Sequence, residues 1–393
     1  METLSLNTKQ RLLNVDALRG FALVSIMLLH NLEHFDFFFK PKNLPDWMVQ
    51  LDQTIWDSTF FLFAGKSYAM FAFLFGVTFF IQMNNQAKRG NDFRLRFAWR
   101  LLLLFVFGMI NSAFYEGDIL TLYAFVGLFL IPFAKLNSKT VLIAAFILFL
   151  QPFEIGKLIY YFQNPGIEIG DPESWAYFGK LNEYIPGNSL IETIKGNLTN
   201  GKKAVVLWSW ENGRFFHLLC LFILGMVASK KNLFVLSNKN KRFWLKIFII
   251  SIILFIPLFY IQKNLIGTID SKAVKVTIRA IEKSWTNFAF TFVLLSGFLL
   301  LYFSKFWQKV LNFFSPMGKM SLSNYIFQTV IGTTLYYGFG FGLYKYTGAT
   351  YSLLIGIACS ILLIKFSSWW MKNHKRGPLE QIWHNLTWLN SKK

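Results

Sequence analysis

Hydrophobic positions in this chain form long continuous runs, not the alternating or one-faced patterns of soluble strands and helices. A run of about 20 residues is long enough to cross a bilayer as an α-helix. Scanning with that window predicts about ten spans: 17–33, 67–83, 97–115, 119–134, 140–160, 215–229, 244–262, 285–304, 320–343 and 351–371. The pattern therefore predicts an all-α, polytopic membrane helical bundle, with residues 1–393 forming a single membrane-embedded domain.

Composition agrees with a membrane protein and narrows its partners. Of the 393 residues 54% are hydrophobic and 19% aromatic, including 46 Phe, which is too apolar for an ordinary soluble chain. A net charge of +20 would suggest nucleic acid in a soluble domain, but beside membrane spans a basic excess is explained first by the positive-inside rule and by anionic lipid. We therefore expect the lipid bilayer as partner and no nucleic acid. Cys220 and Cys359 both lie in apolar runs, which indicates neither a disulfide framework nor a thiolate metal site.

The short basic loops predict the orientation. Lys and Arg gather between the second and third spans, and again between the sixth and seventh, so both loops are expected in the cytoplasm. Counting through even numbers of spans then places the N-terminus and the C-terminal tail, 372–393, in the cytoplasm as well. The basic residues concerned are Lys88, Arg89, Arg94, Arg96 and Arg100 in the first loop, Lys230, Lys231, Lys239, Lys241, Arg242 and Lys246 in the second, Lys9 and Arg11 before the first span, and Lys372, Lys375, Arg376, Lys392 and Lys393 in the tail.

Two connecting segments differ from the short loops. Residues 161–213, predicted outside, carry Pro and Gly turn signals and interfacial aromatics. This external loop is long enough to cap a cavity, and a passive linker is the alternative. Residues 265–283 mix polar and apolar positions and are predicted as an interfacial amphipathic helix. The sequence lacks the paired, interrupted helices of inverted-repeat transporters, which weakens a transporter interpretation.

The first span carries ionisable groups that are expensive inside a membrane and therefore indicate a functional site. Arg19 and His30 are eleven positions apart, so they lie within about 20° on one helix face and about 16 Å apart along the axis. Asp16 precedes Arg19 by three positions and can pair with it. We predict His30 as a general base and Arg19 as the group that holds an anionic ligand or orients the site. The alternative is a helix-end ion pair with a packing histidine.

Residues 30–34 read His-Asn-Leu-Glu-His, which formally matches a zinc-protease pattern. Such a site needs a third acidic ligand, and Glu116 is the nominee. The competing interpretation, which we favour, is that Glu33 and His34 meet the outer membrane interface, and we expect no metal.

Further polar residues lie in or beside the spans, at the outer side or at helical spacing, and are predicted to bind substrate. Interface snorkelling explains any one of them equally well. They are Lys66, Asp118, Arg214, His217, Asn324 and Gln328.

Several motifs resemble the YeiB-like membrane proteins, the domain of unknown function 418 family. Those in the N-terminal part are Arg11 with Asp16-Ala17-Leu18-Arg19-Gly20-Phe21-Ala22, Gly65-Lys66 with Phe73-Leu74-Phe75-Gly76, and Gly117-Asp118-Ile119-Leu120 with Tyr123. Those in the C-terminal third are Gly318-Lys319-Met320-Ser321-Leu322-Ser323-Asn324-Tyr325 with Gln328, Tyr337-Gly338-Phe339-Gly340, and Gly377-Pro378-Leu379-Glu380 with Trp383. Together they cover most of the chain outside residues 161–213.

That family is similar in its first span to transmembrane acyltransferases, whose pattern of Arg, ten residues and His is met by Arg19 and His30. The resemblance implies that acyl-CoA is presented from the cytoplasm and that His30 serves the acceptor hydroxyl.

We therefore expect a multi-pass protein of the bacterial cytoplasmic (inner) membrane. It would transfer an acyl group, most simply acetyl, from acyl-CoA to a hydroxyl of a glycan or small metabolite. His30, Arg19 and Asp16 would form the catalytic group, with Arg96 and Arg100 holding the CoA phosphates. A transporter or flippase using the same polar residues, and an accessory subunit without chemistry, remain the alternatives.

Overall fold

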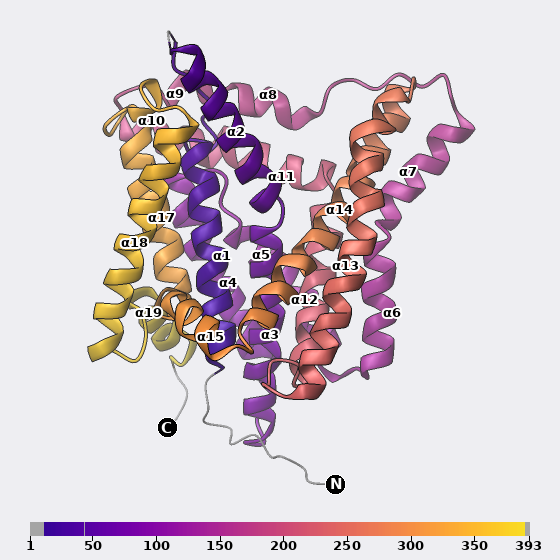
Figure 1. The fold of residues 1–393 in the computed structure, drawn as a ribbon, viewed down its shortest axis with the longest axis vertical. Helices are drawn as coiled ribbons and strands as arrows, with labels where there is room; N and C mark the ends of the chain where they lie inside the picture. Colours follow the sequence, from indigo (N-terminus) through magenta and orange to yellow (C-terminus); the bar gives the residue numbers. More distant parts are fainter. Residues whose placement is uncertain (1–11, 43, 390–393) are drawn as a thin grey trace.

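The computed structural model describes residues 12–42 and 44–389, and every regular element in these ranges is a helix. Figure 1 shows the long helices running mostly along the longest axis, with the short helices α8 to α11 near the upper end. Helix α1 begins at the lower end, where α19 also lies. The basic residues Lys9, Arg11, Lys392 and Lys393 lie outside the described residues. The α-helices are α1 (Leu13–Leu32), α2 (Asp46–Phe63), α3 (Ser67–Ala87), α4 (Arg94–Phe114), α5 (Leu120–Leu128), α6 (Ser138–Phe149), α7 (Pro152–Gln163), α8 (Glu173–Gly179), α9 (Leu181–Tyr184), α10 (Leu190–Gly196), α11 (Lys202–Glu211), α12 (Arg214–Lys230), α13 (Asn238–Asn264), α14 (Lys272–Leu301), α15 (Lys305–Leu311), α16 (Ser315–Lys319), α17 (Ser321–Tyr336), α18 (Ala349–Asn373) and α19 (Pro378–Thr387). Short 3-10 helices lie at Ile131–Lys135, Ile266–Thr268, Asn312–Phe314 and Leu343–Lys345, and a π-helix at Asn197–Gly201.

Six helical segments of the described chain are long and apolar enough to cross a membrane, or up to eight if two bent helix pairs each form one span. One of the six, Asp46–Ala87, combines α2 with α3. The bent pairs are α6 with α7, at 41°, and Leu190–Glu211 with α12, at 73°. The chain is thus an all-helical, multi-pass membrane protein, as the hydropathy pattern predicted.

Two of the ten predicted spans are shorter helices than their apolar runs suggested. The run at 119–134 holds only the nine residues of α5, followed by a 3-10 turn that starts at Ile131 with Pro132 in its first turn. The run at 320–343 holds α17, which has 16 residues and ends at Tyr336. In both places apolar residues continue beyond the end of the helix, some buried, such as Leu130 and Tyr337, and some exposed, such as Phe129 and Phe341, so hydropathy overstated the helix length.

Two other segments differ from the expectation. Residues 161–213 are largely helical instead of a loop, because α8 to α11 pack on one another and on the upper end of α4. The region 265–283 is not a separate interfacial helix: α14 starts at Lys272, capped by the Ser271 hydroxyl on the Val274 amide, and continues into the bundle. Within the predicted tail, α19 packs against α4.

Glycines let four helix segments approach closely. A Cβ on Gly76 of α3 would lie 1.9 Å from the carbonyl oxygen of Phe222, and one on Gly225 of α12 would lie 1.9 Å from that of Phe73. Gly20 of α1 faces α16 in the same way, with a Cβ 2.0 Å from the Phe314 carbonyl oxygen. Small residues at membrane helix interfaces allow such backbone contact, so these pairs fix the spacing of α3 against α12 and of α1 against α16.

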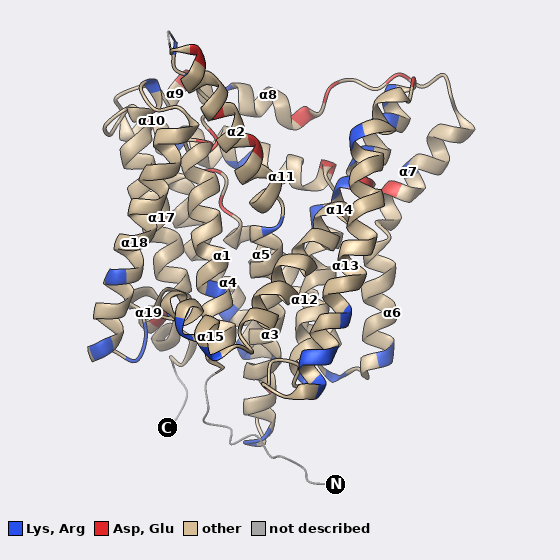
Figure 2. Ribbon diagram, in the orientation of Figure 1, with Lys and Arg blue, Asp and Glu red and all other residues tan. Residues whose placement is uncertain are grey.

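The surface of the bundle fits a bilayer. Only 11% of the apolar window of α13 is buried, and its outward residues include Ile249, Ile253 and Ile256. An apolar helix face without a protein neighbour is accounted for when lipid covers it. Figure 2 shows Asp and Glu mostly toward the upper end, whereas Lys and Arg occur at the lower end and also on the upper part of α14.

Candidate functional site

Two cavities lie one above the other along α1. The lower cavity, of about 450 Å³, lies between the end of α3, the start of α4, and α19, and it includes Arg19. The upper cavity, of about 410 Å³, lies between the end of α1, the start of α3, α12 and α14, and it includes His30. Neither cavity is lined by both Arg19 and His30. Arg19 and His30 lie on one face of α1, as their spacing predicted, but they line different cavities.

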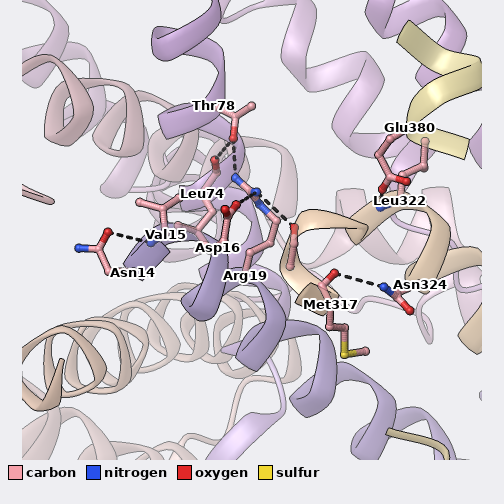
Figure 3. A network of polar contacts seen from close by, with 11 residues as sticks. Asn14, Val15, Asp16, Arg19, Leu74, Thr78, Met317, Leu322, Asn324 and Glu380 are labelled. Carbon is pink, nitrogen blue, oxygen red and sulfur yellow. Dashed lines mark hydrogen bonds and ion pairs between the residues drawn. The ribbon is translucent and has the colours of Figure 1, made fainter. Parts of the chain in front are cut away.

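Arg19 is held at the closed end of the lower cavity by three partners. Its Nη2 donates to Thr78 Oγ1 at 2.8 Å, and its Nη1 lies 3.3 Å from Asp16 Oδ1 and 3.4 Å from the Gly318 carbonyl oxygen. Figure 3 shows these contacts meeting between α1, α3 and α16. Asp16 is buried, so the predicted pair forms inside the protein. Arg19 therefore joins three helices and also faces the cavity.

The lower cavity is rich in cations and aromatic rings. Arg100 of α4 faces it with its guanidinium 4.0 Å above the Trp383 ring, a cation–π contact. The Glu380 carboxylate is engaged elsewhere, accepting from the amides of Leu322 and Ser323 and from the Ser323 hydroxyl at the start of α17. The remaining charged or ionisable lining residues are Arg19, Arg89, Lys319, Lys375, Arg376 and His384. This excess of positive charge suits a phosphate-bearing ligand.

Helix α19 forms one wall of the lower cavity because α4 holds it in place. Arg96 donates to the Thr387 carbonyl oxygen at 2.8 Å and Arg100 to Thr387 Oγ1 at 3.1 Å, while Trp383 donates back to the Arg100 carbonyl oxygen at 3.0 Å. Of the two arginines predicted to hold phosphate, Arg100 lines the cavity and Arg96 does not. Burial and the nearby guanidinium groups of Arg376 and Arg100 lower the pKa of His384, which keeps its ring neutral near pH 7.

The upper cavity brings together His30 and three of the six predicted substrate residues: Lys66, Arg214 and His217. The His30 ring packs 5.0 Å, centroid to centroid, from the Tyr115 ring, and no described residue hydrogen-bonds it. Tyr115 itself donates to Asp36 Oδ2 at 2.9 Å. The imidazole is therefore positioned by packing, and its nitrogens are available to a ligand.

Lys66 and Arg214 reach the cavity through tight turns. Gly65, at φ +77°, adopts a left-handed conformation between α2 and α3 that sends Lys66 inward, and a Cβ there would overlap Asn287. Gly213, at φ +63°, plays the same part before Arg214 at the start of α12. Sequence analysis could have used both glycines as turn signals beside a charged residue.

The other predicted substrate residues support the fold and line neither cavity. Asp118 accepts from the Asn111 amide at 3.0 Å and lies 3.7 Å from Lys202 Nζ. Asn324 donates to two carbonyl oxygens and to Ser367 Oγ. Gln328 donates to the Leu23 carbonyl oxygen at 3.2 Å. Asn324 and Gln328 thus form hydrogen bonds with buried backbone groups. Their helical spacing in the sequence does not distinguish this role from ligand binding.

The zinc-like pattern is not assembled. Helix α1 ends at Leu32, and His34 has a left-handed φ of 48°, which turns its imidazole away to Ser352 and Thr347. Glu116 accepts a hydrogen bond from the Tyr337 hydroxyl. In the described parts of the chain no group of three or more His, Cys, Asp or Glu is placed to hold a metal.

A thin layer separates the two cavities. The Tyr123 hydroxyl, from a residue that lines the lower cavity, donates at 2.5 Å to the carbonyl oxygen of Tyr68, which lines the upper cavity. Phe71 packs against Tyr123 with ring centroids 6.2 Å apart. Hydropathy could not identify this layer, since aromatic residues occur throughout the chain.

Residues 161–213, the segment expected to be a loop, contribute to the upper cavity. Val205, Trp208 and Asn212 line it, and Asn197 anchors the segment by donating to the carbonyl oxygens of Ala113 and Phe114. Of the two alternatives, a cavity cap and a passive linker, the structure supports the cap.

Comparison with known proteins identifies the family. Residues 228–390 match the family described as "Protein of unknown function (DUF418)". The chain is 26% identical to "Uncharacterized protein YxaH" of Bacillus subtilis (strain 168), over 98% of this chain and 96% of that protein. It is 25% identical to "Uncharacterized 39.9 kDa protein in amylase 3'region" of Bacillus acidopullulyticus, over 96% of this chain and 94% of that protein. It is also 32% identical to "Uncharacterized protein YeiB" of Escherichia coli (strain K12), over 23% of this chain and 24% of that protein. No solved structure matches the chain. Residues 228–390 are therefore assigned to the DUF418 family, to which the sequence motifs also point.

Proposed function

We propose that the protein is a membrane acyltransferase that moves an acyl group from cytoplasmic acyl-CoA to a hydroxyl of an acceptor in the upper cavity. The observation that carries the proposal is the arrangement of the two cavities: a basic, aromatic cavity lies below a cavity that is lined by the imidazole of His30. Arg19 and His30, one in each cavity, lie on the same face of α1. Guanidinium groups and tryptophans suit the phosphates and adenine of CoA.

The reaction would proceed by general base catalysis. His30 accepts the proton of the acceptor hydroxyl, whose oxygen attacks the thioester carbonyl carbon. The carbon–sulfur bond breaks, an ester forms, and the CoA thiolate leaves and takes up a proton. For the thioester to reach the upper cavity, the layer that contains the Tyr123 to Tyr68 hydrogen bond would have to open, because these two residues line different cavities.

The test uses purified protein with acetyl-CoA labelled in the acetyl group and bacterial membrane extract as the source of acceptors. We expect free CoA to appear together with label in the acceptor fraction. Replacement of His30 by Gln should abolish both signals, because the base is lost. The matched control is His374→Gln, since His374 is exposed and lines neither cavity. Equal CoA release by wild type and His30→Gln would refute the base.

A transporter or flippase is the second candidate. Two cavities toward opposite ends of the bundle, with a thin layer between them, are also what alternating access to one pathway requires. A transporter would release no thiol from acetyl-CoA, yet would exchange a labelled substrate across vesicles. Thiol release that depends on His30 would reject it.

We also propose the finer topology: about ten membrane passages, with the short helices α5 and α17 completing crossings inside the bundle and both termini in the cytoplasm. The lower end carries the basic residues of the 88–100 and 230–246 loops, in accord with the positive-inside rule. With relatives in Bacillus and Escherichia, the bacterial cytoplasmic membrane is the proposed location. The orientation is tested with the variants Arg89→Cys and Trp175→Cys. A thiol reagent that does not cross the membrane should label Trp175→Cys in intact cells, and Arg89→Cys only after the cells are opened.

A further inference from the structure

The upper cavity contains three cations from three different elements. Lys66 follows the α2–α3 turn, Arg214 begins α12 and Lys283 lies on α14. None of the three forms an ion pair within 4.0 Å with a carboxylate of the described chain. Two carboxylates, Glu33 and Asp36, line the same cavity from the end of α1, and Asp36 is engaged by the Tyr115 hydroxyl. The cavity is therefore lined by three cations and two carboxylates.

Lys66 is costly in this position unless an anion accompanies it. Only 8% of its surface is exposed, and its Nζ lies 5.6 Å from the centroid of the Phe290 ring. A buried ammonium without a counter-charge is strongly disfavoured, so such groups are paired or bind ligands. Lys66 therefore points to a ligand of opposite charge.

Arg214 is prepared for a multi-oxygen anion. Its guanidinium lies 4.3 Å from the Tyr68 ring and 3.9 Å from the Trp208 ring, and it donates no hydrogen bond to a described residue. Stacking on its faces leaves the N–H groups at its edge available, and that edge matches two oxygens of a phosphate. Beside it, His217 is 3% exposed and its Nε2 lacks a partner in the described chain.

We propose that the upper cavity binds a phosphate-bearing anion through Lys66, Arg214 and Lys283. This deepens the proposed function, because the same cavity would hold the acceptor: its phosphate would contact the three cations and a nearby hydroxyl would face His30. The adjoining wall is apolar, with Phe61, Phe255 and Phe259 lining the cavity. Phosphate can come from a lipid headgroup, whose chains would lie on these rings, or from a soluble phosphate ester.

The approach to the cavity supports an anion as well. Lys275 and Arg279 precede Lys283 at intervals of four residues, so the three follow one face of α14 from its outer end toward the cavity. Figure 2 shows this basic band on the upper part of α14. A line of like charge leading to a cavity raises the local concentration of oppositely charged ligands.

The test measures binding without acyl-CoA, so its result is independent of acyl transfer. The probes are sn-glycerol 1-phosphate for a soluble source and phosphatidylglycerol for a lipid source. Glycerol and diacylglycerol are the matched uncharged compounds. Binding is read by native mass spectrometry and by the shift in melting temperature. We expect one phosphate probe to bind and its uncharged match not to bind, and the probe that binds identifies the source.

Substitution assigns the site. Lys66→Gln, Arg214→Gln and Lys283→Gln should each weaken phosphate binding at least about tenfold, because each removes a cation from the ligand. Lys66→Arg should retain most of the binding. Lys345→Gln, in the exposed end of the 3-10 helix at Leu343–Lys345 and outside both cavities, is the control and should bind as wild type does. Lys283 is exposed, so its replacement leaves the fold intact.

Unchanged affinity in Lys283→Gln and Lys66→Gln, or equal binding of charged and uncharged probes, would overturn the proposal. Phosphate binding without thiol release would reject acyl transfer only.

Discussion

Replacing Gly318 by Ala should separate α1 from α16. The added Cβ would lie 1.8 Å from the Asp16 carbonyl oxygen and 2.8 Å from the Gly20 amide nitrogen, whereas ordinary contact begins at 3.4 Å. The backbone cannot give way as a flexible side chain would, so one segment has to move by about 1.6 Å, the difference between 3.4 and 1.8 Å. Overpacking of this kind costs about 1 to 3 kcal/mol.

The same movement would disturb the lower cavity. The Gly318 carbonyl oxygen accepts from Arg19 at 3.4 Å, already a long bond, so a shift of α16 would break it. The guanidinium would keep Thr78 and Asp16 but lose the Gly318 carbonyl oxygen as an acceptor. We therefore expect Gly318→Ala to lower both the stability of the bundle and the affinity for a ligand of the lower cavity.

The assay compares melting temperatures in detergent and free energies of unfolding. Gly156→Ala in α7 is the matched control, because nothing lies within 4 Å of its Cβ position and its φ is not left-handed. In that helix Ala is favoured over Gly by up to about 1 kcal/mol. If the melting temperature of Gly318→Ala is no lower than those of wild type and Gly156→Ala, the close contact of α1 with α16 is not present in the membrane protein.

Three further predictions concern polar groups in the interior. Asn324→Ala should lower the free energy of unfolding by about 1 to 3 kcal/mol, because it leaves Ser367 and two carbonyl oxygens without their donor. Chemical unfolding measures this loss, and stability equal to that of wild type would contradict the hydrogen bonds. Asp118→Asn should lower the free energy of unfolding by about 3 to 5 kcal/mol, because Lys202 loses its carboxylate partner. In a double-mutant cycle, the double variant with Lys202→Met should recover part of this loss. Additive losses would argue against the ion pair. Burial raises the pKa of Glu380 above its ordinary value of 4.5, so the folded protein binds that proton more tightly than the unfolded chain does. The contribution of Glu380 to the free energy of unfolding is present below pH 4.5 and is lost as pH rises through the pKa of the folded state. Glu380→Gln should therefore lose less stability than wild type between these two pH values. Identical stability profiles of the two proteins against pH would refute this.

Helix positions were largely predictable, whereas helix lengths were less so. Long apolar runs gave α1, α3, α4, α13 and α18, since a membrane leaves a backbone few ways to satisfy its polar groups other than an α-helix. Helix α2 escaped the prediction because acidic residues such as Asp52 and Asp57 interrupt its hydropathy.

The candidate site was predictable in its components but not in its grouping. Charged residues in the first span pointed to Arg19 and His30, and Lys66, Arg214 and His217 were named from their place at span ends. Lys283 was not singled out, because a polar segment before an apolar run is equally typical of an interface. Asn324 and Gln328 had the same sequence signature as ligand-binding residues, yet their partners are backbone carbonyl oxygens.

By itself the sequence determined that the chain crosses a membrane repeatedly as helices and that the first span bears a guanidinium and an imidazole on one face. The reason is that both features depend on composition and on the fixed period of a helix. Only the tertiary structure decided that Arg19 and His30 belong to different cavities, because the Tyr123 to Tyr68 hydrogen bond that divides them joins residues 55 positions apart in the chain. It likewise decided which cations share a cavity, since Lys66, Arg214 and Lys283 meet only when α3, α12 and α14 pack together.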